Sequence, residues 1–165
     1  MTLRSMLHKQ LATAQRIVTD GHELVPAWRI GTPRTDWVIL SRFDQTEPSR
    51  QEWVLHHLRR FMAWTFAQSF VVTGYKGLTP TALIPGGSKA IVGVAASRFN
   101  RLVLCQPIRR EPSLTFGKPE SMDCSLIDGA YWDLLPARHE TISPEEANEL
   151  NAVFGVDGEL SARWL

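Results

Sequence analysis

KAIVGVAASRFNRLVLCQPIRR, residues 89 to 110, contains two apolar runs separated by a short polar stretch. The first run, Ala90 to Ala96, is the longest apolar segment of the chain, and its length is typical of a buried strand. The chain then reverses near Phe99 and Asn100 and returns as a second strand. Gly93 inside the first strand indicates a bulge or a close neighbour. This stretch therefore predicts a strand pair with at least one covered face.

Upstream of the pair, the pattern first predicts a helix over 3–19 and then two strands, over 22–30 and 37–43, joined by a hairpin at 31–36. A second helix from 49 to about 68 and a strand over 69–78 are predicted to follow. Ser49 and Glu52 have the spacing of a capping box, with Ser49 as N-cap. Pro26 has no N–H for a ladder, so we expect its strand to lie at an edge or to carry a bulge.

Downstream of the pair, the signals predict a short strand over 113–116, a loop over 117–123 and a short helix over 125–135. Residues 143–155 have the complete signals of a helix, with Ser143 as N-cap, Pro144 at the first position and Gly155 as the stop. The fold class predicted from this order is α+β. We expect one domain, 1–165, with a mostly antiparallel sheet of about five or six strands, helices mainly on one face and two short helices at the C-terminus.

Composition favours an ordinary globular domain, because 44% of the 165 residues are hydrophobic and 21% are charged. The sequence has no apolar stretch of roughly the 20 residues that a membrane-spanning helix needs, so we expect no membrane association. Two cysteines are too few for a disulfide scaffold, which favours a cytoplasmic setting. We expect no cofactor. The general character resembles small proteins of bacteria and their mobile elements.

The helix predicted from residue 49 has a mixed aromatic and basic stripe beside its core face. At 100° per residue, His56, Arg59, Ala63 and Ala67 point away from the sheet. The larger core face comprises Val54, Leu55, Leu58, Phe61, Met62, Thr65, Phe66 and Ser69. Trp53, His57, Arg60 and Trp64 lie between these two faces. Tryptophan and arginine recur in binding hot spots, so these four residues are the predicted partner-binding site, unless another element of the chain covers them.

Charge is distributed unevenly along the chain. Residues 1–120 hold 16 Lys and Arg against 8 Asp and Glu, whereas residues 121–165 hold 2 against 9. The acidic part is therefore predicted to dock on the basic body. Alternatively, arginines at the two ends of the strand pair could bind the phosphates of a nucleic acid. The residues of this alternative site are Arg98, Arg101, Arg109 and Arg110.

Motifs for catalysis are weak in this sequence. PGGSK at 85–89 lacks the spacing of a phosphate loop, and no metalloprotease, paired C-x-x-C or dinucleotide motif is present. His22 with Asp36 or Asp44 could exchange protons in a small hydrolase-like site, although polar residues are common at such turns. We assign no catalytic residue and no metal ligand.

These observations favour a non-catalytic interaction or regulatory module. The predicted partner is a protein or a second copy of the chain. Nucleic acid is the first alternative, and an enzyme is the second.

Overall fold

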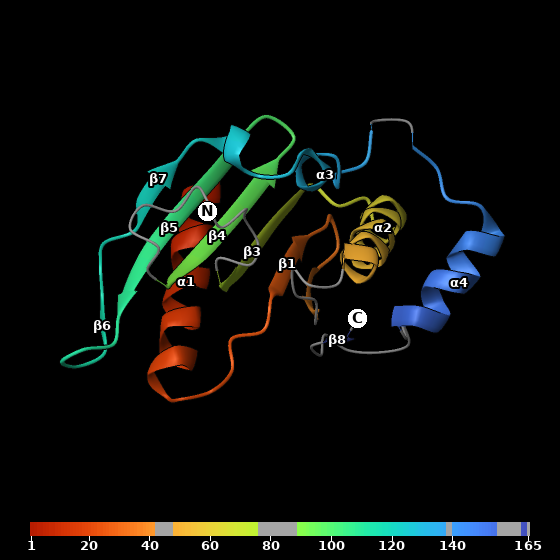
Figure 1. Ribbon diagram of the computed structural model, residues 1–165. Helices are drawn as coiled ribbons and strands as arrows, with labels where there is room; N and C mark the ends of the chain where they lie inside the picture. The colour runs from red at the N-terminus through yellow and green to blue at the C-terminus, as the bar shows by residue number, and fades with distance from the viewer. Residues whose placement is uncertain (42–47, 76–88, 138–139, 155–162, 165) are drawn as a thin grey trace.

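The computed structural model describes residues 1–41, 48–75, 89–137, 140–154 and 163–164. A mostly antiparallel sheet forms the middle layer, and helices lie on both sides of it (Figure 1). The strands are β1 (Ala27–Gly31), β2 (Asp36–Leu40), β3 (Ser69–Tyr75), β4 (Ala90–Ser97), β5 (Arg101–Arg109), β6 (Thr115–Phe116), β7 (Glu120–Met122) and β8 (Arg163–Trp164). Six of these have three residues or more. The predicted α+β class is therefore confirmed, and the described residues form a single domain.

The strands follow the spatial order β6-β5-β4-β3-β1-β2-β8, and β7 also pairs with β5. Among the described strands, only β8 runs parallel to its neighbour, β2. The strand pair at 89–110 is confirmed as β4 and β5, which are in register from Ala90 opposite Pro107 to Ala96 opposite Arg101. β4 lies between β5 and β3, so its backbone is paired on both sides.

One sheet face is covered by α1 (Leu3–Thr19), which confirms the helix predicted over 3–19. The Thr2 side chain caps this helix by accepting a hydrogen bond from the Ser5 N–H at 3.1 Å. The buried side of α1 packs on β3, β4 and β5. A side chain at Gly93 would place its Cβ 2.5 Å from Leu7 Cδ1. The close neighbour predicted for Gly93 is therefore this helix.

The opposite face carries three α-helices, α2 (Pro48–Trp64), α3 (Gly129–Trp132) and α4 (Pro144–Phe154), and the short 3₁₀ helix η4 (Cys124–Leu126). Thus most helices lie on one face, with α1 on the other. Aromatic rings fill the larger core, where Trp28 stacks on Tyr131 at 5.7 Å and Phe61 packs on Phe154 at 4.5 Å. Trp28 Nε1 donates to Ser41 Oγ at 2.9 Å, so this buried indole N–H is satisfied.

Several local predictions need correction. β1 pairs with both β2 and β3, so it is not an edge strand, and Pro26 lies just before it. Helix α2 already includes Pro48, which places Ser49 inside the helix rather than at its N-cap. Part of the predicted loop at 117–123 forms β7, which pairs with β5, and β8 was not predicted. The helix predicted at 143–155 is confirmed, and Ser143 Oγ accepts from the Glu146 N–H at 3.2 Å.

Across the described residues, each helix is too short or too polar to cross a membrane.

Candidate functional site

The predicted partner-binding residues at the N-terminal end of α2 form a small stack. The rings of Trp53 and His57 are 4.0 Å apart, and the Arg50 guanidinium lies 4.5 Å from the Trp53 ring. His57 Nδ1 lies 2.8 Å from the Trp53 carbonyl oxygen, to which it donates one turn back along the helix. Trp53 is 39% exposed. The Trp53 ring is therefore partly exposed, although Arg50 and His57 already contact it.

The middle of α2 contacts the acidic C-terminal part of the chain. Arg59 pairs with Glu140 at 3.1 Å, and its Nε also donates to the Asp133 carbonyl oxygen. Arg60, a predicted binding residue, forms an ion pair with Glu146 of α4. Two arginines of the basic body thus contact the acidic part, whereas the wider docking predicted from charge stays a prediction.

His56 and Arg59 are exposed, as the helical projection predicts. Partial burial lowers the pKa of His56, and the nearby charges of His57, Arg60 and Arg59 lower it further. Ala63 was predicted on the same side but is buried. Arg59, one turn earlier, contacts Asp133 and Glu140, so the C-terminal part of the chain reaches this side of α2, where α3 and α4 lie beside the helix (Figure 1).

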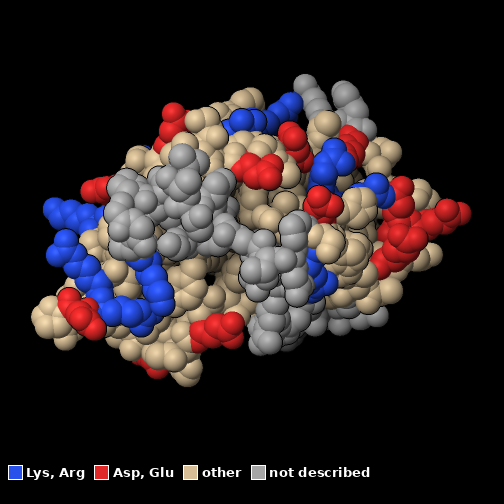
Figure 2. Space-filling model, in the orientation of Figure 1, with Lys and Arg blue, Asp and Glu red and all other residues tan. Residues whose placement is uncertain are grey.

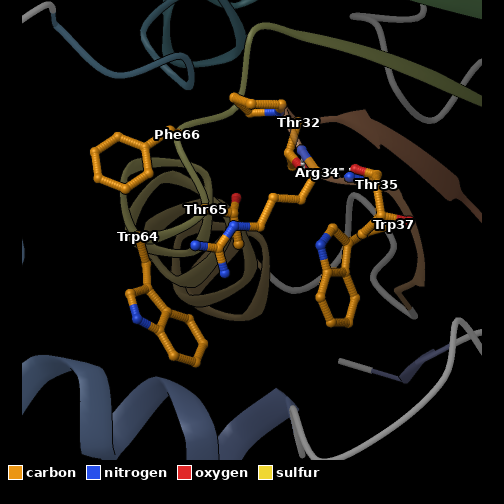
Figure 3. A pocket seen from close by; sticks show the side chains of 8 residues that line it. Thr32, Arg34, Thr35, Trp37, Trp64, Thr65 and Phe66 are labelled. Atoms are coloured by element: carbon orange, nitrogen blue, oxygen red, sulfur yellow. Dashed lines mark hydrogen bonds between the residues drawn. The ribbon is translucent and has the colours of Figure 1, made fainter.

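Trp64, the fourth predicted binding residue, lies two turns beyond His57 at the opposite end of α2. It lines a hollow of about 360 Å³ between the end of α2 and the turn that connects β1 to β2 (Figure 3). We call this hollow the aromatic pocket. Its described lining consists of Thr32, Pro33, Arg34, Thr35, Trp37, Trp64, Thr65 and Phe66. The stripe predicted on one helix is therefore divided between two separate places.

The end of α2 has an unusual conformation at Phe66. The projection placed this residue in the core, but the helix ends at Trp64 and Phe66 is 70% exposed. Its φ of 56° is left-handed. The Ala67 N–H donates to the Met62 carbonyl oxygen at 2.9 Å, and the Phe66 N–H donates to the Ala63 carbonyl oxygen at 3.3 Å. This pair of hydrogen bonds is the pattern of a Schellman cap. Glycine usually occupies that position, because a side chain there costs about 1–2 kcal/mol.

The opposite wall of the aromatic pocket is the β1–β2 turn, which Thr32 holds in place. Thr32 Oγ1 donates to the Thr35 carbonyl at 2.6 Å and accepts from the N–H groups of Arg34 and Thr35. The Arg34 side chain extends from this turn across the pocket toward Thr65, with Trp64 and Trp37 on either side (Figure 3). Within the described part of the chain, this lining contains no Asp or Glu.

The four arginines of the predicted nucleic-acid site lie in two pairs. Arg98 and Arg101 flank the β4–β5 turn, where Phe99 is 85% exposed, and the Arg101 guanidinium lies 5.3 Å from the Trp132 ring. Arg109 and Arg110 lie at the other end of β5, roughly 25 Å away along the strand. Figure 2 shows basic side chains gathered near this second end and acidic ones over α4.

The predicted hydrolase-like site is not assembled among the described residues. His22 precedes β1, whereas Asp36 lies opposite Gly31 at the far end of that strand. Asp36 instead pairs with Arg29 at 3.2 Å, and Asp44 lies outside the described residues. In the described ranges, no three His, Cys, Asp or Glu residues are grouped to hold a metal ion. Burial and the charge of Glu120 raise the pKa of the Cys105 thiol, so it is a poor nucleophile at neutral pH.

The sequence suggests Trp64 as a binding residue, but it does not group Arg34, Trp37 and Phe66 with Trp64 around one hollow. GTPRTD indicates a connection between two strands, and Trp37 belongs to a predicted strand, so neither suggests a pocket. A weak signal for Phe66 was that no glycine follows Trp64 at the end of the helix, so a left-handed cap there must use another residue type. Searches of protein-family models, curated proteins and solved structures find no match to this chain.

Proposed function

We propose that this chain is a non-catalytic protein-binding module whose partner contacts the aromatic pocket and Phe66 at its rim. The observation that carries the proposal is Phe66, a large aromatic side chain that is 70% exposed and held at a φ of 56°. Strained residues concentrate at functional sites, and exposed aromatic residues are frequent in binding hot spots. A binding role accounts for both unfavourable features of this residue.

The proposal places the centre of the binding surface at Trp64 rather than at Trp53. Trp64 is half-buried and lies edge-on to Phe61, with ring centroids 6.2 Å apart, so its ring is held in place. A held ring loses little conformational entropy when a partner covers it. Trp53 and His57 contact each other, and Arg60 contacts Glu146, which leaves these three residues as an outer part of the proposed surface.

A comparison of two exposed phenylalanines tests this function. Wild-type protein, Phe66→Gly and Phe99→Ala would be immobilised, and the proteins that each retains from its host lysate would be quantified by mass spectrometry. We expect a partner that wild type and Phe99→Ala retain and Phe66→Gly loses. Equal retention by all three proteins would contradict the proposal. Sedimentation of the three proteins shows whether the partner is a second copy of the chain.

Nucleic-acid binding is a second candidate function, located at the β4–β5 turn. Phe99 is exposed between Arg98 and Arg101, and Arg98 lies 5.5 Å from its ring. An exposed ring beside arginines can stack on the bases of a single strand while the arginines contact its phosphates. Salt-sensitive binding of a labelled single-stranded oligonucleotide, lost in Phe99→Ala, is the expected result. Binding that persists unchanged in this variant would remove the turn from consideration.

A further inference from the structure

We infer that the aromatic pocket recognises a carboxylate placed next to an aromatic side chain, as in an acidic–aromatic peptide segment. This inference rests on the proposed function, because it assigns the chemistry of the partner at the same pocket. The observations that support it are the aromatic walls of the pocket and the position of Arg34.

The walls of the pocket are suited to a flat apolar group. Trp37 is buried and meets Phe61 edge-on at 5.4 Å, so the orientation of its ring is fixed. Trp64, on the same helix as Phe61, contacts the Phe61 ring as well, and Phe66 completes the rim of the pocket. A volume of about 360 Å³ lies at the lower end of the range for ligand pockets. A single aromatic side chain, rather than a long segment, is therefore the expected occupant.

The charge of the ligand follows from two arginines on the same hairpin. Arg29 lies on the other face of β1 and pairs with Asp36 at 3.2 Å. Arg34 extends over the pocket, where the described lining supplies no carboxylate (Figure 3). A guanidinium forms its strongest hydrogen bonds with a carboxylate that it contacts through two N–H groups. A carboxylate from the partner would give Arg34 the pairing that Arg29 already has within the chain.

Two of the three threonine hydroxyls that line the pocket are already engaged within the protein. Thr65 Oγ1 donates to the Phe61 carbonyl at 2.9 Å, and Thr32 Oγ1 donates to that of Thr35. Both protons are used inside the protein, so neither hydroxyl has one to donate to an anion. One arginine among aromatic rings fits a singly charged, planar carboxylate better than a phosphate dianion.

Two matched ligands test the inference. N-acetylphenylalanine carries a carboxylate, whereas N-acetylphenylalaninamide has the same ring without the charge. Each would be titrated into ¹⁵N-labelled wild type, Arg34→Gln and Arg29→Gln, with chemical shifts of the tryptophan indole N–H groups as the readout. Arg34 is exposed, so its replacement is not expected to unfold the protein, and the spectrum itself reports on the fold.

Wild type is expected to bind the acid about tenfold more tightly than the amide, which is the discrimination typical of one charge-assisted hydrogen bond. Arg34→Gln should bind the two ligands equally, and Arg29→Gln should keep the wild-type preference. Equal binding of acid and amide by wild type, or a preference that survives in Arg34→Gln, would overturn the inference. So would the absence of any shift at millimolar ligand.

Peptides separate a partner segment from a free small molecule. Acetyl-Phe-Glu-amide should bind more tightly than acetyl-Phe-Gln-amide, and the difference should disappear in Arg34→Gln. If Phe66→Gly loses a protein partner but the peptides bind equally, protein binding stands and the inference of a carboxylate fails. If the peptides differ but no protein is lost from Phe66→Gly, the chemistry of the pocket stands and the proposed function fails.

Discussion

The two ends of α2 carry similar side chains in different states. At the N-terminal end, Arg50 and His57 both contact the Trp53 ring, and His57 also bonds to the helix backbone. At the C-terminal end, Trp64 borders an open pocket, and Phe66 is exposed in a left-handed conformation. Residue types alone predicted one continuous binding surface, but the structure shows one end that closes on itself and another that is open.

The two ends of α2 show that contact within the chain, rather than composition, distinguishes a candidate binding residue. An aromatic ring whose face is already covered gains little from a partner, whereas a ring at the wall of a hollow can still exclude water. The same reasoning separates Arg29, which pairs with Asp36, from Arg34. The open end of α2 is therefore the part of the molecule on which experiments should concentrate.

The largest expected effect is on the free energy of unfolding, when the Phe61 ring beneath the open end of α2 is removed. Phe61 is fully buried and contacts Trp37, Trp64 and Phe154. We expect Phe61→Ala to lower the free energy of unfolding by about 3–5 kcal/mol, since a buried ring is replaced by a cavity. Urea denaturation measures this change. Phe99→Ala, at an exposed position, is the control and should change the free energy by less than about 0.5 kcal/mol.

Alanine substitutions of Trp64 and Trp53 test the difference between the two ends of α2 directly. Trp64→Ala removes a wall of the aromatic pocket and should weaken binding of N-acetylphenylalanine about tenfold or more, as for a hot-spot residue. Trp53→Ala should leave this affinity nearly unchanged, because Trp53 is not part of the described lining. Titration followed by NMR gives both dissociation constants. Equal losses in the two variants would show that the ends of α2 act as one surface.

Glycine at position 66 should make the protein more stable while it removes the proposed contact. The left-handed backbone at Phe66 costs about 1 kcal/mol that glycine avoids, and the exposed ring has little burial to lose. Phe66→Gly should therefore raise Tm by about 2–4 °C in a thermal scan. Phe66→Ala keeps the strain and is the control. A lower Tm for Phe66→Gly would mean that the ring contributes to packing.

Local signals allowed much of the fold to be predicted. Helix α1 follows from apolar periodicity and α4 from its capping residues, whereas β4 and β5 follow from two apolar runs with a short reversal. β7 and β8 have three and two residues, so their existence depends on pairing with β5 and β2 rather than on a pattern of their own. Such pairings are set by the tertiary fold.

The candidate site was harder to predict, for a related reason. The aromatic pocket combines the β1–β2 turn with the end of α2, and no sequence pattern joins two such distant segments. The projection of α2 also continued through residues 65–69, where the helix has already ended. Beyond that end the 100° rule no longer applies, which is why Phe66 was assigned to the core although it is exposed.

The smallest expected effect is a pH dependence of the free energy of unfolding, which arises from His56 on the outer side of α2. Partial burial and the charges of His57, Arg60 and Arg59 hold the pKa of His56 below its usual 6.5. His56 borders a small hollow between α2 and α4, which Glu146 and Glu149 of α4 also line. The unfolded chain therefore binds the proton at a higher pH than the folded protein does. Stability should fall as the pH drops through about 6.5, by a fraction of a kcal/mol because the side chain is exposed.

His56→Gln should flatten this part of the stability curve, which urea denaturation between about pH 7.5 and about pH 5 measures. His8→Gln, at an exposed position of α1, is the matched control and should retain the wild-type slope. A steeper slope in His56→Gln would mean that the two glutamates of α4 outweigh the cations of α2. The middle of the helix would then hold α4 in place by attraction to His56, and α4 would loosen as that histidine loses its proton.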